Sequence, residues 1–478
     1  MTSLPAIRIP PRRSSRPASP RLSRHAGFWG IAFAFFAVTA LSTTPSSLYG
    51  LYEQHEHLSS ITITGVYAVY AAGTVISLVF AGQVSDWYGR RTVMLPALGV
   101  AIAATVVFLV WRSLTGLLVA RVLTGLALGA AVATATAFIT DLDGDPGATA
   151  TPRAGIVATI ANIGGLAAGP LIAGLLARYA ADPLTLPFVV VLAALILGVV
   201  LVTLAPEGHP AADPRPRYHP QRLAAPADAR RQFAAAATGV FIAFAVAGLF
   251  AGLTGTLLAG PLHHHSPALI GATIFLTFGT SVLVQTTTTS WPAHRLVAAG
   301  IAPLIAGLGL LAASAWTSPP NLALFLTSGV VAGAGIGAII RGSLTIAIAA
   351  SSPDDRAGTL ASFFTAGYVG LSLPVIGIGL ALQHLSPRVT LLIFGAAAAV
   401  AILAAAPTLA RPVPGRPEPS EPASDPITSM CCCFGAQTKA RDPQPAAPDA
   451  DLRSAKPQDD RVTLERDPRP PINSVPEA

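Results

Sequence analysis

Twelve long apolar runs constrain the fold of this chain more than any other feature of its sequence. Each run has about 20 residues, which is the length that an α-helix needs to cross the hydrocarbon core of a bilayer. Short apolar runs can be buried strands in soluble proteins, but twelve runs of this length predict an all-α membrane protein with twelve transmembrane helices. The runs cover residues 28–50, 61–84, 92–111, 115–138, 156–178, 186–205, 233–259, 267–289, 296–316, 321–349, 358–382 and 389–409.

The scarcity of charged residues supports the same interpretation. Charged residues make up 11% of the chain and hydrophobic residues 52%, whereas an average soluble domain is roughly 25% charged. A soluble domain with so few charges would have a poorly solvated surface. The composition therefore predicts a chain whose main surroundings are a lipid bilayer.

The positions of Lys and Arg predict the orientation in that bilayer. If the N-terminus is cytoplasmic, the outer loops hold only three arginines, Arg112, Arg178 and Arg388. Two more, Arg121 and Arg341, lie within runs. All other Lys and Arg residues fall in inner tails and loops. The positive-inside rule then predicts a multi-pass protein of the cell membrane with both termini in the cytoplasm. The arginines are scattered over separate loops, so nucleic acid is not an expected partner.

The chain is predicted to contain two duplicated halves. Glycines and prolines in the two halves match at an offset of 204 positions, as Gly125 does with Gly329, Gly129 with Gly333 and Pro170 with Pro374. Such matches predict two pseudo-symmetric six-helix bundles, the arrangement that alternating access requires. The expected parts are a disordered basic N-terminal tail (1–27), an N-terminal bundle (28–205), a cytoplasmic linker (206–232), a C-terminal bundle (233–410) and a disordered C-terminal tail (411–478).

A cluster of one acid and two arginines lies between the second and third runs, in the sequence GQVSDWYGRR. It resembles the loop between helices 2 and 3 of the major facilitator superfamily, whose pattern is roughly G-x-L-x-D-R-x-G-R-[RK]. Trp87 stands where that family usually has an arginine. The residues that match are Gly82, Asp86, Gly89, Arg90 and Arg91.

The resemblance covers residues 28–409 and implies that this loop closes an inner gate. It implies that Asp86 engages the start of the eleventh helix near Arg356, where a carboxylate at a helix N-terminus gains about 0.3–1 kcal/mol. It also implies that Arg90 pairs with Asp141 at the inner end of the fourth helix. The alternative is a tight turn whose positive charge only sets the topology.

An arginine lies within the fourth run, in the sequence RVLTGLALG. Arg121, Gly125 and Gly129 share one face of a helix, and the glycines allow a neighbouring helix to approach closely. Burying arginine in a membrane costs at least about 2.5 kcal/mol, so Arg121 is not expected to face lipid. The motif resembles the family's fourth-helix motif, which implies a role in substrate binding or proton coupling. The alternative is an arginine that bonds backbone carbonyls for structure.

The fifth run contains GGLAAGPLIAG, with Gly165, Gly169, Pro170 and Gly174. It resembles the antiporter signature of facilitator-superfamily drug exporters, roughly G-x-x-x-G-P-x-x-G-G. Ala173 departs from that pattern. The resemblance implies a kinked helix that packs closely during exchange, and the alternative is ordinary packing of small residues.

Every Asp and Glu lies outside the deep membrane, so the proton carrier is not evident from the sequence. Glu53 is the best candidate if the first helix extends past Tyr52, because arginine does not lose its proton. Arg341, in the tenth run, is a further candidate for substrate or coupling, with snorkelling to the surface as the alternative. Polar side chains expected near a central cavity, lined by helices 1, 4, 7 and 10 as the resemblance implies, are Thr43, Tyr67, Asn162 and Gln285. The alternative for the hydroxyls is a bond to the backbone.

These features predict a secondary transporter and not an enzyme. The expected activity is proton-coupled efflux of a small amphiphilic drug or metabolite by alternating access, carried out by a monomer. Import or uniport of a small organic anion, with Arg121 as its ligand, is one alternative, and a transporter-like membrane sensor is another. No cofactor and no metal site are expected. The adjacent Cys431, Cys432 and Cys433 are expected to be reduced thiols, with lipidation or soft-metal binding as alternatives.

Overall fold

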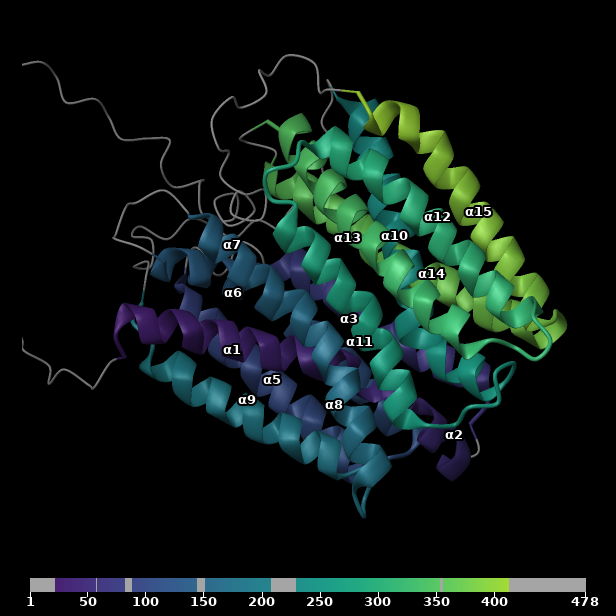
Figure 1. Cartoon of the computed structure of the whole chain (residues 1–478). Coiled ribbons are helices and arrows are strands. Elements are labelled where there is room, and N and C mark those ends of the chain that lie inside the picture. The colour runs from purple at the N-terminus through teal and green to yellow at the C-terminus, as the bar shows by residue number, and fades with distance from the viewer. Residues whose placement is uncertain are drawn as a thin grey trace, which may run out of the picture. The chain divides into compact units, whose positions relative to one another are not determined.

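The computed structural model describes residues 22–56, 58–81, 88–143, 151–207, 229–352 and 356–411, which belong to one compact unit, Met1–Gln437. Within these ranges, twelve helical segments are long and apolar enough to cross a membrane, and no strand occurs. The all-α membrane fold expected from the sequence is therefore confirmed (Figure 1). Most of the expected tails and linker, with the three cysteines, lies outside the described residues.

The first half of the chain supplies six of these segments. Its helices are α1 (Arg24–Thr43), α2 (Tyr49–Glu56), α3 (Ser60–Ala81), α5 (Arg90–Val110), α6 (Leu114–Leu142), α7 (Pro152–Thr159), α8 (Gly165–Tyr179) and α9 (Leu186–Leu204). A 3₁₀ turn, Thr44–Ser47, separates α1 from α2. A π turn, Ile160–Gly164, joins α7 to α8, so that they form one span.

The second half supplies the other six segments, each of which is one continuous helix. They are α10 (Arg230–Ala259), α11 (Pro267–Thr287), α12 (Ala293–Trp316), α13 (Leu322–Ala350), α14 (Arg356–His384) and α15 (Pro387–Leu409). The polar breaks between these helices fall where the sequence analysis expects them.

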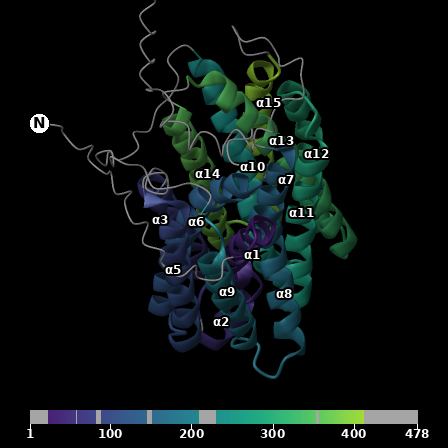
Figure 2. The ribbon, with the colours of Figure 1, turned by 90° about the vertical axis from the view of Figure 1, so that its left-hand side faces the viewer.

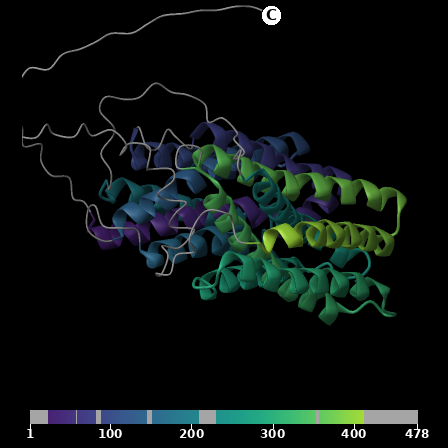
Figure 3. The same cartoon turned by 90° about the horizontal axis from the view of Figure 1, so that it is seen from above.

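The two halves form separate groups of helices that meet along two seams. Figure 1 shows the purple-to-blue helices of the first half grouped apart from the teal-to-yellow helices of the second, and the view from above in Figure 3 shows the same grouping. At one seam α8 packs against α11, and at the other α3 packs against α14. Figure 2 shows these two pairs on opposite flanks. The two pseudo-symmetric bundles expected from the repeat are therefore observed.

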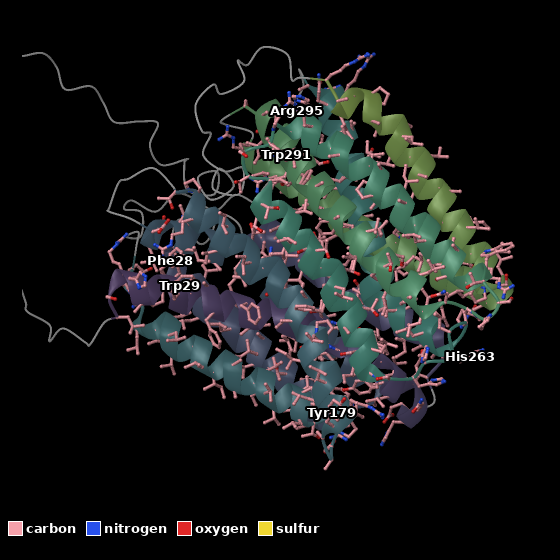
Figure 4. All side chains as sticks on the ribbon, in the orientation of Figure 1. Phe28, Trp29, Tyr179, His263, Trp291 and Arg295 are labelled. Carbon is pink, nitrogen blue, oxygen red and sulfur yellow. The ribbon has the colours of Figure 1, made fainter. Side chains whose placement is uncertain are left out.

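The two ends of the bundle carry different residues. Phe28, Trp29, Trp291 and Arg295 lie toward one end (Figure 4). It is called the gate-loop end, because α5, which follows the predicted gate loop in the sequence, begins there with Arg90, whose partner Asp141 also contacts Arg24. Tyr179 and His263 lie toward the opposite end (Figure 4). Apolar side chains such as Val400 remain exposed on the outer helices, as expected for a surface that faces lipid.

The break in the first span follows from Pro45. Proline has no amide hydrogen and cannot continue the hydrogen-bond ladder of an α-helix, so the chain forms the short 3₁₀ turn before α2 begins. The sequence analysis treats residues 28–50 as one run with a break at Pro45. The structure places that break inside the run and extends the helical path to Glu56.

Hydroxyl groups of the first span bond to carbonyl groups of the fifth. Thr39 Oγ1 is 3.0 Å from the carbonyl oxygen of Ala161, and Thr43 Oγ1 is 2.9 Å from that of Leu166. The second bond has a clear cause, because Pro170 has no amide hydrogen to donate to the carbonyl four residues before it. A carbonyl without a partner is costly in a membrane interior, and Thr43 satisfies this one.

Glycines set the closest helix contacts within each half. A Cβ atom added at Gly125 would lie 2.0 Å from the carbonyl oxygen of Tyr70, and one added at Gly129 would lie 2.6 Å from that of Thr74. Gly333 is the repeat partner of Gly129, and a Cβ atom added there would lie 2.2 Å from the carbonyl oxygen of Thr277. Glycine is therefore required where α6 crosses α3 and where α13 crosses α11.

We expect Gly125→Leu to prevent correct packing of α6 against α3, because the new side chain has no space. The destabilisation should exceed the 1–3 kcal/mol that is usual, as an order of magnitude, for overpacking. Thermal unfolding of the purified protein in detergent measures it. Gly99→Leu on α5 is the matched control, since a Cβ atom there meets nothing within 4 Å. Equal unfolding temperatures for the two variants would contradict the requirement for glycine where α6 crosses α3.

Candidate functional site

A cavity lies between the two halves. It has a volume of about 1080 Å³ including the part that is open to solvent, and its lining comes from both halves. The expected lining helices, α1, α6, α10 and α13, all contribute, and α3, the α7–α8 span, α11 and α14 contribute as well. On α6 and α13 the lining residues lie in the half of each helix nearer the gate-loop end, as Thr136 and Leu344 show.

Four of the predicted site residues line this cavity, namely Thr43, Tyr67, Asn162 and Gln285. The sequence analysis did not select a further set of polar residues that the structure places in the lining: Thr136, Thr159, Ser281 and Tyr368. Ser281 could have been found, because it lies one helical turn before Gln285 and so on the same face of α11. Nothing in the sequence singles out the two threonines from the many others in the spans.

The lining is mostly apolar and aromatic, and its hydroxyl groups are largely used by the backbone. Thr136 Oγ1 is 3.1 Å from the carbonyl oxygen of Val132, and Thr159 Oγ1 is 2.8 Å from that of Gly155. Among the described residues that line the cavity, none carries a formal charge. The cavity therefore suits a ligand that is largely apolar and makes a few hydrogen bonds.

Arg121 is fully buried, but it is not part of this lining. Its guanidinium group donates a hydrogen bond of 2.6 Å to the carbonyl oxygen of Ser42 and another to the hydroxyl oxygen of Tyr49. The guanidinium carbon also lies 5.3 Å from the ring centroid of Tyr70 and 5.9 Å from that of Tyr67. Arg121 thus connects the two sides of the break in the first span.

Aromatic faces stabilise the buried charge of Arg121. A cation over a tyrosine ring gains about 0.5–2 kcal/mol, with the larger values where water is excluded. Two of these rings, Tyr67 and Tyr70, also line the cavity. They therefore form both part of the cavity wall and part of the surroundings of Arg121.

The structure places the other two proposed coupling residues away from the cavity as well. Glu53 lies on α2, beyond the break, and is partly buried. Arg341 is only 2% exposed, so its side chain does not snorkel to the surface. Its guanidinium donates to the carbonyl oxygens of Gln285, at 2.6 Å, and Thr289, at 3.3 Å. Arg341 therefore bonds the backbone at the end of α11, where a cation is favourable.

The described part of the predicted gate contains two ion pairs. Arg90 Nε is 3.1 Å from Asp141 Oδ2, which connects the start of α5 to the end of α6. Arg91 Nε is 3.6 Å from Glu207 Oε2, just after α9. Gly89 has a φ of 94°, which is unfavourable for residues with a side chain. Gly82 and Asp86 lie outside the described residues.

The small residues of the fifth span contact two different helices. A Cβ atom at Gly169 would lie 2.2 Å from the carbonyl oxygen of Ala40 on α1, and Gly165 also faces α1. A Cβ atom at Gly174 would lie 2.2 Å from the carbonyl oxygen of Pro267 on α11. The fifth span thus packs against α1 of the first half and against α11 of the second half.

The halves touch at the opposite end of the bundle. Besides the contact of Gly174 with Pro267, a Cβ atom at Gly271 would lie 2.2 Å from the carbonyl oxygen of Pro170. Between α14 and α3, a Cβ atom at Gly379 would lie 2.9 Å from the side chain of Thr64. These close contacts border the cavity on the side away from the gate-loop end.

Comparisons with known proteins agree with this architecture. A family model described as Major Facilitator Superfamily matches residues 27–319. The chain is similar in structure to a mutant of the nucleoside transporter NupG, with 13% identity, coverage of 80% of this chain and 99% of that chain, and a TM-score of 0.63. No curated protein sequence matches the chain.

Two further solved structures are similar. One is the human organic anion transporter MFSD10 (TETRAN), with 16% identity, coverage of 81% and 100%, and a TM-score of 0.58. The other is a bacterial homologue of the human lysosomal transporter Spinster in an inward-facing and unoccupied conformation, with 16% identity, coverage of 86% and 96%, and a TM-score of 0.56. At these identities the likeness shows the fold alone.

We expect Asp141→Asn to lower the thermal stability of the protein. Arg90 is 3% exposed and Asp141 22%, so the substitution removes a carboxylate that pairs with a buried guanidinium, at a cost of about 1–3 kcal/mol. Unfolding in detergent measures the change. Asp143→Asn is the control, because the amide oxygen can still accept the hydrogen bond from Thr151, and the ion pair that is lost is a long one, 3.9 Å, to an Arg153 that is 52% exposed. Pairs with so exposed a partner contribute about 1 kcal/mol at most. If Asp143→Asn lowers the unfolding temperature more than Asp141→Asn does, the buried pair is not the more stabilising of the two.

Proposed function

The chain belongs to the major facilitator superfamily, and from this premise we propose that it exports a small amphiphilic drug or metabolite in exchange for protons. As a member of that superfamily it is a secondary transporter and not an enzyme. The observation that carries the proposal is the cavity between the halves, which is largely apolar and lined by neutral polar groups. A cavity of this kind suits an amphiphile better than a sugar or an ion.

The rival proposal of organic anion uptake has less support from the geometry. It requires Arg121 as the ligand of the anion, but both described hydrogen bonds of that guanidinium go to the protein, to Ser42 and Tyr49. No described residue of the cavity lining is a cation. An anion there would lose its hydration without gaining a charged partner, which is costly in an apolar site.

Alternating access is supported by the distribution of contacts between the halves. Close contacts at the opposite end, such as that of Gly174 with Pro267, border a cavity that extends toward the gate-loop end. This is the arrangement of one state of a two-state cycle, in which one side is closed while the other gives access. The antiporter-like fifth span supplies that closed contact, which supports export by exchange.

The gate proposal assigns roles to both charged pairs. Arg90 with Asp141, and Arg91 with Glu207, hold the start of α5 to neighbouring segments. They thereby fix the position of Gly89, which follows Gly82 and Asp86 of the predicted gate loop in the sequence. Asp86 would then bind the N-terminus of α14 when the gate closes. Such a contact is weak enough to break in each cycle.

Proton exchange requires a group that titrates, and Glu53 is the proposed carrier. No described carboxylate lines the cavity, and arginine keeps its proton under these conditions. Glu53 lies on α2, whose first residue, Tyr49, accepts a bond from Arg121. A protonation change at Glu53 would therefore act on a segment that Arg121 connects to the cavity wall.

The proposed setting is the cell membrane, with both termini in the cytoplasm and the protein acting as a monomer. The concentration of Lys and Arg in the loops and tails on one side supports this orientation. In that orientation the gate-loop end is cytoplasmic. The cavity is then the inward-facing binding site from which an exported compound is taken up.

We expect substrate-dependent proton flux in proteoliposomes. With a pH-sensitive dye inside the vesicles, an amphiphile that moves one way should drive protons the other way, and collapse of the pH gradient should slow its movement several-fold. Protein-free liposomes with the same compounds are the control for passive leakage. Protons that move with the compound would favour the importing rival, and no proton movement with any transported compound would contradict antiport.

We expect Gly174→Leu to open the opposite end. The leucine cannot fit against the carbonyl oxygen of Pro267, so the state described here should become less populated. The measurement is the labelling of Ser281→Cys by an impermeant maleimide from that side, in a variant with Cys431, Cys432 and Cys433 replaced by serine. Labelling should increase several-fold and transport should fall.

Gly279→Leu on α11 is the matched control for this experiment. A Cβ atom at Gly279 meets nothing within 4 Å, so labelling and transport should stay at the parental level. If Gly174→Leu is labelled no faster than Gly279→Leu, the contact of α8 with α11 does not close the opposite end.

A further inference from the structure

Two carboxamide side chains line the cavity from opposite halves of the protein. Asn162 comes from the π turn of the fifth span, and Gln285 comes from α11. A carboxamide presents a donor and an acceptor side by side, so it can pair with a ligand edge that carries the complementary acceptor and donor. The hydroxyl groups of Thr43, Thr136 and Thr159 already bond backbone carbonyls. With the tyrosine hydroxyls, the amides are therefore among the lining groups whose side-chain hydrogen bonds the backbone does not already take.

The side chain of Asn162 has no partner within the described part of the chain. No hydrogen bond from or to its amide is found there, although the residue is only partly exposed. Its position in a π turn is relevant, because such turns are rare and are frequently found at functional sites. The carbonyl of the preceding residue, Ala161, is bonded by Thr39. The backbone around Asn162 is thus held while its side chain stays available.

Gln285 is held more firmly than Asn162. Its amide nitrogen donates to Ser281 Oγ over 3.2 Å, and its backbone carbonyl accepts from Arg341 over 2.6 Å. The side-chain oxygen has no hydrogen bond to another described residue. Arg341 therefore fixes the backbone that carries Gln285, and Ser281 orients the amide, which leaves an acceptor for a ligand.

Aromatic rings form much of the remaining wall. Tyr67 and Tyr70 pack edge to face, with ring centroids 5.4 Å apart, and Phe244 packs against Tyr368 in the same way at 5.6 Å. All four line the cavity. Phe244 and Tyr368 are only partly buried and can contact a further planar group, whereas Tyr67 and Tyr70 are buried and form the wall behind it. Contacts between aromatic rings gain about 0.5–1.5 kcal/mol beyond the area that is buried.

From these observations we propose that the substrate is an uncharged aromatic compound whose polar edge carries an adjacent donor and acceptor, as in an amide, a lactam or a cyclic imide. Asn162 and Gln285 bind that edge, and the tyrosines and phenylalanines bind the ring. A charged analogue is excluded because no described residue of the lining can neutralise its charge. This inference rests on the proposed function and narrows its substrate class.

The test uses three probes of one shape that differ in charge: 2-naphthamide, 2-naphthoate and 2-naphthamidine. Their binding to the purified full-length protein in lipid nanodiscs is measured by equilibrium dialysis at pH 7. We expect 2-naphthamide to bind at least about tenfold more tightly than either charged probe, since burial of an unpaired charge costs more than the 1.4 kcal/mol that corresponds to tenfold. Equal or tighter binding of a charged probe, or binding of none of the three, would overturn the proposal.

Variants then test the two amides. Asn162→Leu and Gln285→Leu should each weaken the binding of 2-naphthamide by about tenfold, the loss expected for a hydrogen-bonded edge. Both should leave the binding of 2-methylnaphthalene, which has no polar edge, unchanged. That second probe separates lost recognition from a collapsed cavity. Gln383→Leu is the matched control, because Gln383 lines a different recess at the opposite end.

Two results would contradict the role of the amides. One is undiminished binding of 2-naphthamide to both leucine variants, and the other is equal weakening for 2-methylnaphthalene. The dialysis experiment does not depend on movement across the membrane. Tight binding of 2-naphthamide without flux in proteoliposomes would therefore contradict the proposed transport but support the substrate class. Flux of charged amphiphiles alone would support the proposed transport but contradict the substrate class.

Discussion

The contact of one helix backbone with another at glycine is the interaction on which the rest of this structure depends. At Gly125 and Gly333 there is space only for hydrogen, because a carbonyl oxygen of the neighbouring helix lies where a Cβ atom would be. These contacts fix α6 on α3 and α13 on α11. They thereby set the positions of the Tyr67 and Tyr70 rings and of Gln285, which α3 and α11 carry into the cavity. The chemistry of the cavity thus follows from places where side chains are absent.

Polar groups in the interior differ in whether the protein itself already supplies their hydrogen-bond partners. Thr43 bonds the carbonyl that Pro170 leaves without a donor, and Arg121 bonds carbonyl and hydroxyl oxygens on either side of the break at Pro45. Near each of these prolines the helix lacks some of its backbone hydrogen bonds, and a threonine hydroxyl or the Arg121 guanidinium donates hydrogen bonds there instead. The two amides, Asn162 and Gln285, differ from these groups because they line the cavity with hydrogen-bonding atoms that no described residue uses.

The sequence was sufficient to predict the spans, the duplicated halves and the break at Pro45, because apolar length, glycine spacing and the missing proline amide each act locally. It also selected Thr43, Tyr67, Asn162 and Gln285 as cavity residues. It did not predict the π turn around Asn162, because the sequence IANIG is equally compatible with a continuous α-helix. Nor did it show that Arg121 lies outside the lining, since the rings of Tyr67 and Tyr70 reach it from another helix.

Arg121 has a consequence for the way the protein is made. An arginine in the middle of a span is expensive to insert when it has no partner in the bilayer. The groups that surround it, Ser42, Tyr49, Tyr67 and Tyr70, all precede it in the chain. The acceptors of Arg341 at Gln285 and Thr289 precede it too. Because synthesis runs from the N-terminus, each of these arginines leaves the ribosome after the segments that will bind it, so its partners already exist in the chain when it emerges.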